Sequence, residues 1–141
     1  MGLKVGEGRV RVLEKKRVLV ADDNWRVLNF VRMGLQMAGY QVLTCLTWEQ
    51  TLKMAESEEP DIILLDMLMP RIDRSEVLRE LRSHTRAPVI ASSIDDAIAS
   101  ETLRLGAAEF LTRPFKTEDL VAAIERILAH LDQGGEPGPQ T

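Results

Sequence analysis

The sequence of 141 residues has one cysteine, few aromatic residues and no long apolar run. Cys45 alone excludes an intrachain disulfide and a thiolate metal site, and its apolar surroundings predict a core position. The longest apolar runs fall far short of the roughly 18 residues that a membrane-spanning helix needs. The N-terminus also lacks the apolar core of a signal peptide. We therefore expect a cytoplasmic protein that does not contact the membrane.

Positive charge is not in excess either, since the formal net charge is -4 and the pI is about 5.3. This balance does not favour a general nucleic-acid-binding surface. The length fits one domain with a substantial core, which we expect at residues 16–131. Residues 1–15 form an N-terminal extension in which an alternating patch at 10–13 could add an edge strand or stay loose. Residues 132–141, rich in glycine and proline, are expected to be a flexible tail or the start of a linker.

What the chain does contain is a regular alternation of short apolar runs and helical patterns. The apolar runs predict five strands, at 17–21, 41–46, 62–65, 88–93 and 108–112. Apolar residues at helical spacing predict five helices, around 27–38, 47–55, 75–83, 98–105 and 117–128. Two helix starts carry capping signals: Thr47 begins a Thr-x-x-Gln capping box, and Thr117 precedes two acids. Strand and helix alternate with short connections, so the fold class is α/β, with a five-stranded parallel sheet between helices.

Acidic residues follow two of these strands. Asp66 ends the buried run at 62–65, and Asp22 and Asp23 follow the first strand. An Asp after a strand is more often a turn former or a helix cap than a functional group. The carboxyl ends of parallel strands nevertheless lie at one sheet edge, where ligands bind in open α/β folds. We therefore expect the three carboxylates to converge.

Such a set of side chains has a definite chemistry. Oxygen ligands without His or Cys suit a hard cation such as Mg²⁺. Acids packed together repel, so without a cation the pKa of at least one should rise. A serine at 92 or 93 and the cation of Arg113, which follow the fourth and fifth strands, are donors suited to phosphoryl oxygens. A carboxylate can itself act as the nucleophile and form an aspartyl phosphate.

Several segments together resemble the receiver domain of two-component response regulators. They are 18–23, 61–66 with Met69-Pro70, 88–90 with the following serine, and 106–115. The resemblance implies a flavodoxin-like fold, a doubly wound parallel sheet with strand order 2-1-3-4-5. It implies that Asp66 accepts a phosphoryl group, and that Asp23, Asp66 and the Leu68 carbonyl bind Mg²⁺. Asp22 would hold a metal-bound water.

By the same resemblance, the phosphoryl donor would be a histidine kinase or a phosphotransfer protein. The hydroxyl after strand four would then move toward the phosphate, and Phe110 would turn inward. Counting from Pro88 favours Ser93 as that hydroxyl, whereas counting back from Arg113 favours Ser92; we choose Ser93. Signalling would use the surface of helix four, strand five and helix five, for a homodimer or a downstream protein. From the residues alone, an aromatic at the end of an edge strand is more often simple packing, so the switch role of Phe110 rests on the resemblance.

Three positions depart from the family pattern. One of them, Arg74 in place of the glycine that commonly follows Asp73, is expected to affect the loop more than the chemistry. Arg113 stands where the family has lysine, and the planar guanidinium is not interchangeable with a compact ammonium. Ile94 stands where the family usually has Ala or Gly, and its branched side chain could crowd an acyl phosphate.

Three functions are therefore weighed. The first is a phosphoacceptor receiver, which is a binding switch with only slow self-catalysed phosphoryl chemistry. The second is a pseudo-receiver, which uses the same fold as an interaction module independent of phosphorylation. The third is a Mg²⁺ phosphohydrolase with an Asp nucleophile, which Leu68 argues against because such enzymes commonly have a second Asp at that position.

Overall fold

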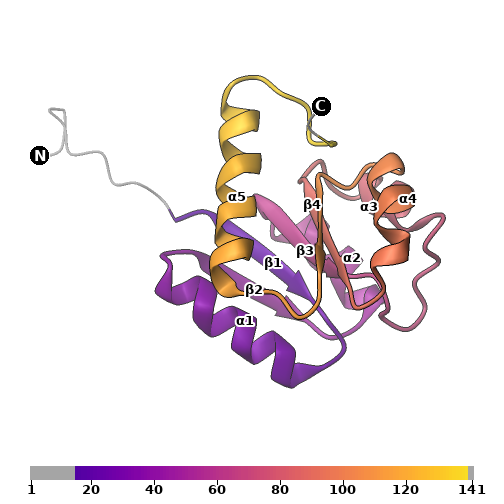
Figure 1. Cartoon of the computed structure of the whole chain (residues 1–141), viewed down its shortest axis with the longest axis horizontal. Helices are drawn as coiled ribbons and strands as arrows, with labels where there is room; N and C mark the ends of the chain where they lie inside the picture. Colours follow the sequence, from indigo (N-terminus) through magenta and orange to yellow (C-terminus); the bar gives the residue numbers. More distant parts are fainter. Residues whose placement is uncertain (1–14, 140–141) are drawn as a thin grey trace, which may run out of the picture.

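The computed structural model describes residues 15–139, so the alternating patch at 10–13, expected either to add an edge strand or to stay loose, lies outside the described part. Strands and helices alternate through these residues (Figure 1). The strands are β1 (Arg17–Ala21), β2 (Gln41–Cys45), β3 (Ile62–Asp66), β4 (Val89–Ser93) and β5 (Glu109–Thr112). The helices are α1 (Trp25–Met37), α2 (Trp48–Ser57), α3 (Val77–Arg82), α4 (Ala99–Arg104) and α5 (Thr117–Asp132), and a 3₁₀ turn, η1 (Asp96–Ile98), precedes α4.

All five strands pair in parallel in the order β2-β1-β3-β4-β5. This confirms the predicted fold class and strand order. In the register of the central strands, Asp66 lies opposite Ser92, and Ser92 lies opposite Leu111. The carboxyl ends of β3, β4 and β5 therefore lie within one residue of each other, and Arg113 directly follows the last residue of β5.

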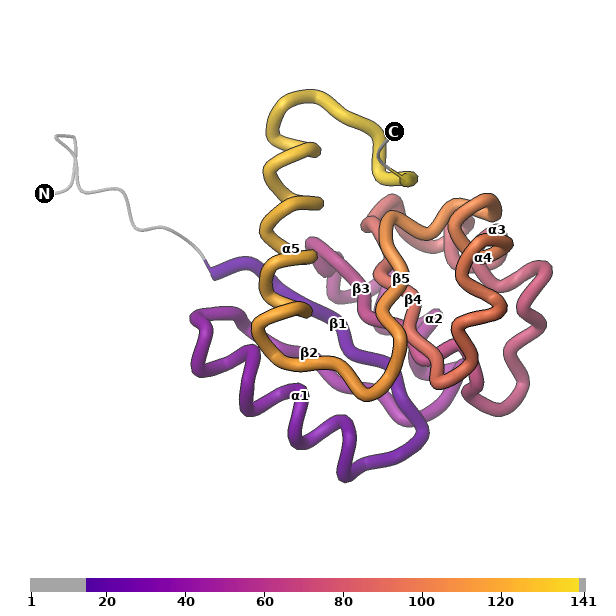
Figure 2. The backbone as a smooth tube through the Cα atoms, in the orientation of Figure 1, coloured from indigo at the N-terminus to yellow at the C-terminus, as the bar shows by residue number. Residues whose placement is uncertain are grey.

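The helices cover both faces of the sheet (Figures 1 and 2). On one face, α1 and α5 pack side by side over β1, β3 and β4, and their apolar contacts include Leu35 and Ile124. On the other face, α2, α3 and α4 pack over the alternate residues of the same strands, with Leu65 and Leu81 in the second core. The predicted core position of Cys45 is confirmed, with 1% of its surface exposed.

Helix ends show why the local predictions succeeded or failed. Thr47 caps α2 by accepting a hydrogen bond from the Gln50 N–H, as the capping box predicts. The predicted cap at Thr117 is wrong: α5 begins at Thr117 itself, with Lys116 before it and no side-chain cap bond. The Thr117 side chain packs against Gly34 instead. Phe30, one of the apolar set at 27–38, is 66% exposed and does not join the core.

Among residues 15–139, no helix combines the length and the apolar character that crossing a membrane requires.

Candidate functional site at the carboxyl edge of the sheet

Three aspartates meet where β1 and β3 end. Asp22 and Asp23 directly follow β1, and Asp66 is the last residue of β3. One carboxylate oxygen from each lies within 4.8 Å of the others. We call Asp22, Asp23 and Asp66 the acidic edge. The predicted convergence of these carboxylates is therefore observed, with Asp22 and Asp66 buried and Asp23 exposed.

Backbone hydrogen bonds fix the two buried carboxylates. Asp22 Oδ1 accepts the Asn24 N–H at 2.9 Å, and Asp66 Oδ1 accepts the Leu68 N–H at 3.0 Å. Asn24 in turn caps α1, since its side chain accepts from the N–H groups of Arg26 and Val27. Each carboxylate thus has one oxygen oriented by the turn that follows its strand, and its second oxygen is available to other groups.

Burial raises the pKa of Asp66 above its ordinary value, because desolvation disfavours the charged form. The charges of Asp22 and Asp23 add to this rise, whereas the Leu68 N–H and the Arg113 guanidinium oppose it. The expectation that the pKa of at least one acid rises is therefore met. The larger cause is burial, and the repulsion between acids that motivated the expectation is a smaller one.

Arg113 supplies the positive charge of the site. One terminal nitrogen, Nη2, donates to Asp22 Oδ2, and Nε donates to Ser92 Oγ at 3.2 Å. The other terminal nitrogen, Nη1, lies 4.0 Å from Asp66 Oδ2. The guanidinium therefore spans the gap between β1 and β3. The sequence indicated a cation at this position but gave no sign that Asp22 would be its main partner.

The two serines of β4 have different surroundings. Side chains alternate along a strand, so Ser92 lies on the same face as Ile90, toward α1 and α5, and Ser93 lies on the face of Ala91. Both are fully buried. Ser92 Oγ contacts Arg113, whereas Ser93 Oγ accepts the Asp95 N–H at 3.0 Å.

The remaining predicted site residues lie around this edge. Leu68 is in the turn after β3 with its side chain 47% exposed, and the metal-binding role of its carbonyl stays a prediction. Ile94 follows β4 and is 70% exposed. Together with Arg113, Phe115 and residues of α1, it lines a hollow of about 460 Å³. Phe110 is half-buried on β5 and packs against the core beneath α2, α3 and α4.

The residues fit a divalent cation of the Mg²⁺ class. The donors are carboxylate oxygens within reach of one another, and Mg²⁺ prefers one or two carboxylates with the rest of its shell as water. Three carboxylates and one guanidinium also leave two negative charges unbalanced when all are ionised. A doubly charged cation would balance them.

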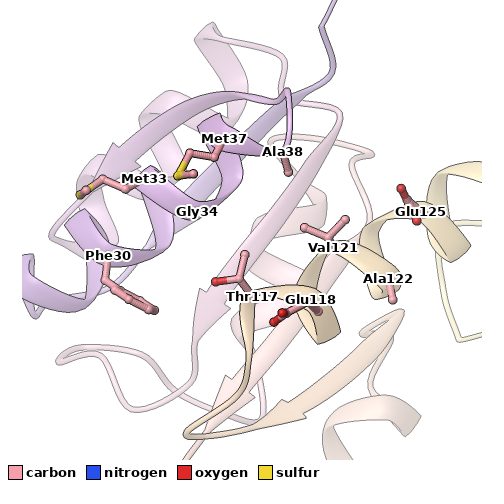
Figure 3. A pocket seen from close by; sticks show the side chains of 10 residues that line it. All are labelled: Phe30, Met33, Gly34, Met37, Ala38, Thr117, Glu118, Val121, Ala122 and Glu125. Carbon is pink, nitrogen blue, oxygen red and sulfur yellow. The ribbon is translucent and has the colours of Figure 1, made fainter.

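A second hollow, of about 710 Å³, lies between α1 and α5 (Figure 3). Its walls are apolar side chains of α1, among them Met33 and Met37, and the Val121 side chain of α5. Glu118 and Glu125 add acidic groups, and no residue of the acidic edge lines it. Acidic and apolar walls do not suit a phosphoryl group, so this hollow is not a candidate for the chemistry.

The doubly wound sheet, with acids and a cation at its carboxyl edge, defines a class of α/β domain whose ligands bind at the carboxyl ends of the strands. Comparison with known proteins identifies the family within that class. The chain belongs to the response regulator receiver domain family, whose model matches residues 18–125.

Individual relatives agree with this assignment. The chain is 34% identical over 116 residues to the alkaline phosphatase synthesis transcriptional regulatory protein PhoP of Bacillus subtilis (strain 168), covering 80% of this chain and 48% of that protein. Its fold matches a CheY-like receiver domain protein from Methanospirillum hungatei JF-1 with a TM-score of 0.79 at 23% identity, covering 86% of this chain and all of the other.

A further match is the receiver domain of the sensor histidine kinase PA1611 from Pseudomonas aeruginosa PAO1, whose structure holds a magnesium ion in the active-site cleft. The two are 26% identical with a TM-score of 0.71, covering 80% of this chain and 97% of the other. The chain spans about half the length of the curated relatives it matches.

Proposed function

We propose that this receiver domain accepts a phosphoryl group on Asp66 in the presence of Mg²⁺ and thereby changes which partner it binds. The observation that carries the proposal is the convergence of three carboxylates with the Arg113 guanidinium at one sheet edge. Family membership supports it, because receiver domains are the phosphoacceptor modules of two-component systems.

The groups divide the chemistry between them. Asp66 Oδ2 is the nucleophile, since its Oδ1 accepts the Leu68 N–H. It forms a bond to phosphorus while the bond from phosphorus to the donor atom breaks, and the donor leaves with that electron pair. Arg113 and a serine hydroxyl, Ser93 or Ser92, then donate hydrogen bonds to the phosphoryl oxygens.

Asp22, Asp23, Asp66 and the Leu68 carbonyl would hold Mg²⁺, with Asp22 acting through a metal-bound water. When bound, the ion neutralises the negative charge that would otherwise repel an incoming phosphoryl group. The magnesium ion of the PA1611 receiver domain supports this assignment by similarity. We propose no catalytic turnover beyond slow self-catalysed phosphotransfer and dephosphorylation.

The proposed setting is a cytoplasmic two-component phosphorelay. A histidine kinase or a phosphotransfer protein would supply the phosphoryl group. Movement of Ser93 and Phe110 would carry the signal to the surface of α4, β5 and α5, where a homodimer or a downstream protein binds. Neither nucleic acid nor membrane is a proposed partner of this chain.

The test is phosphorylation in a purified system. The full chain is mixed with Mg²⁺ and a small acyl phosphate, and its intact mass is compared with that of the Asp66→Asn variant. The proposal predicts a mass gain of one phosphoryl group in the wild type, lost with EDTA and absent in the variant. If a cognate kinase and the acyl phosphate both leave the wild-type mass unchanged, the proposal is wrong.

One observation favours the pseudo-receiver as a second candidate. Arg113 donates to Asp22, so the acidic edge already holds a cation of its own. For a constitutive interaction module, affinity for its partner would be the same with Asp66→Asn as with the wild type. For the phosphoacceptor, phosphorylation would change that affinity in the wild type only.

A further inference from the structure

Ser92 is a buried hydroxyl that the phosphoryl chemistry does not require if Ser93 is the phosphate-binding serine. It has no exposed surface. Its Oγ accepts the Arg113 Nε–H at 3.2 Å, and Ser92 lies opposite Asp66 in the register of β3 and β4. The backbone of Ser92 is held in the sheet, because its carbonyl accepts the Met67 N–H at 2.9 Å.

Holding Nε of an arginine sets the direction of the whole group, because the guanidinium is a rigid planar fork. With Nε on Ser92, Nη2 donates to Asp22 and Nη1 faces Asp66 at 4.0 Å. A lysine ammonium at the same position carries its three donors on a single rotating nitrogen, so a bond to one of them does not direct a second nitrogen. The bond to Ser92 can therefore orient a second nitrogen donor only when the residue at position 113 is arginine.

The orientation of Arg113 determines how Asp22 is hydrogen-bonded. Its Oδ1 accepts the Asn24 N–H and its Oδ2 accepts from Arg113, so both oxygens of this buried carboxylate have protein donors. A divalent cation at the acidic edge must share Asp22 with the guanidinium or displace it. Two cations a few ångströms apart also repel each other in a partly buried site.

We propose that Ser92 is a positioning residue that holds Arg113 on Asp22, so that Arg113 acts as a built-in counter-ion and Ser92 sets the affinity for the divalent cation. The inference shares with the proposed function only the assignment of the acidic edge as the cation site. It does not depend on phosphoryl transfer. The closing experiment therefore contains no phosphodonor.

Mg²⁺ binding to the full chain is measured by isothermal titration calorimetry for the wild type, Ser92→Ala and Arg113→Lys. Ser92→Ala leaves every charge in place and removes only the positioning bond. It is expected to tighten Mg²⁺ binding about tenfold, the lower end of what one hydrogen bond to a charged group contributes. Arg113→Lys keeps the positive charge but removes the planar guanidinium, and it should tighten Mg²⁺ binding to a similar extent.

Two further variants separate positioning from general loosening. Thr51→Val deletes another fully buried hydroxyl, which donates to the Thr47 carbonyl in α2, and should leave the Mg²⁺ affinity unchanged. Ser92→Thr keeps the hydroxyl and should keep the wild-type affinity. If Ser92→Ala does not fold, Arg113→Lys decides the question with the same expected tightening.

The proposal is overturned if Ser92→Ala and Arg113→Lys bind Mg²⁺ with the wild-type affinity or more weakly. It is equally overturned if Thr51→Val tightens binding as much as Ser92→Ala, or if no variant shows saturable binding. A failure of phosphorylation with intact, Ser92-dependent Mg²⁺ binding would contradict the proposed function and leave this inference standing.

Discussion

Gly34 of α1 and Thr117 of α5 lie so close together that a Cβ on Gly34 would stand 2.9 Å from both Cγ2 and Oγ1 of Thr117. Real Cβ atoms do not approach other atoms so closely, so the glycine permits the contact between the two helices. The helix that this contact holds begins four residues after Arg113. The packing of α1 against α5 therefore helps to place the loop that carries the guanidinium.

Gly34→Ala should lower the free energy of unfolding by about 1 kcal/mol in the wild-type background. Overpacking against Thr117 costs about 1–3 kcal/mol and outweighs the better helix propensity of alanine, which is about 1 kcal/mol. In a Thr117→Ala background the Thr117 Cγ2 and Oγ1 atoms are absent, and Gly34→Ala should be stabilising. Urea denaturation of the wild type, the two single variants and the double variant measures both effects. Equal effects in the two backgrounds would show that the close contact has no energetic role.

Cys45 should be inert in the folded protein. Burial raises the pKa of its thiol to about 11, against an ordinary value of 9.0, and only the thiolate is an effective nucleophile. At pH 8 we expect iodoacetamide to label the native chain very slowly and the urea-unfolded chain quickly, as measured by intact mass.

The same pKa has a consequence for stability. Between pH 9 and pH 11 the unfolded state loses the thiol proton before the folded state does, so this group should lower stability as pH rises through that window. A Cys45→Ala variant serves as the control and should lack this part of the pH dependence. Rapid labelling of the native wild type at pH 8 would contradict the buried position.

Much of this architecture can be predicted from the sequence, because the central strands β1 and β3 contain buried apolar runs and each crossover is short. The run at 62–65 and the Asp that follows it place β3 and its carboxylate correctly. Convergence of the acidic edge then follows from parallel pairing alone. Burial of these runs on both faces is what makes the signal strong.

Other features depend on tertiary contacts that no local pattern records. Arg113 and Asp22 are 91 residues apart, and nothing in either segment indicates their ion pair. Thr117 is a residue type that favours helix caps, yet it is the first residue of α5 and its side chain lies against Gly34. The predicted start of the helix at 98 is a 3₁₀ turn, since Asp95 caps a tighter turn by accepting the Ala97 N–H.

Asp66→Asn should raise the melting temperature in metal-free buffer at pH 7 by a few degrees. The pKa of Asp66 is raised chiefly by burial, so the ionised carboxylate disfavours the folded state at neutral pH. As pH falls through the raised pKa toward the ordinary 3.8, the wild-type carboxyl takes up a proton and the advantage of the variant should shrink. Thermal unfolding from pH 7 to pH 4 in EDTA measures this trend. A constant difference across that range would show that Asp66 does not titrate as its surroundings require.

Arg113→Ala should lower the free energy of unfolding in EDTA by about 2 kcal/mol, because it leaves a carboxylate with 1% side-chain exposure without its ion-pair partner. The loss is expected below the range for a fully buried pair, since the Arg113 side chain is itself 17% exposed. Added Mg²⁺ can take over the charge balance of the acidic edge, and ligand binding to the folded state alone stabilises it by mass action. Urea denaturation should therefore show a large difference in stability between Arg113→Ala and the wild type in EDTA, and a smaller difference in excess Mg²⁺.

Arg126→Ala, which removes an exposed ion pair with Glu109, is the matched control and should show a small loss of stability of the same size in both conditions. If Mg²⁺ leaves the deficit of Arg113→Ala unchanged, the guanidinium and the cation do not serve the same carboxylates.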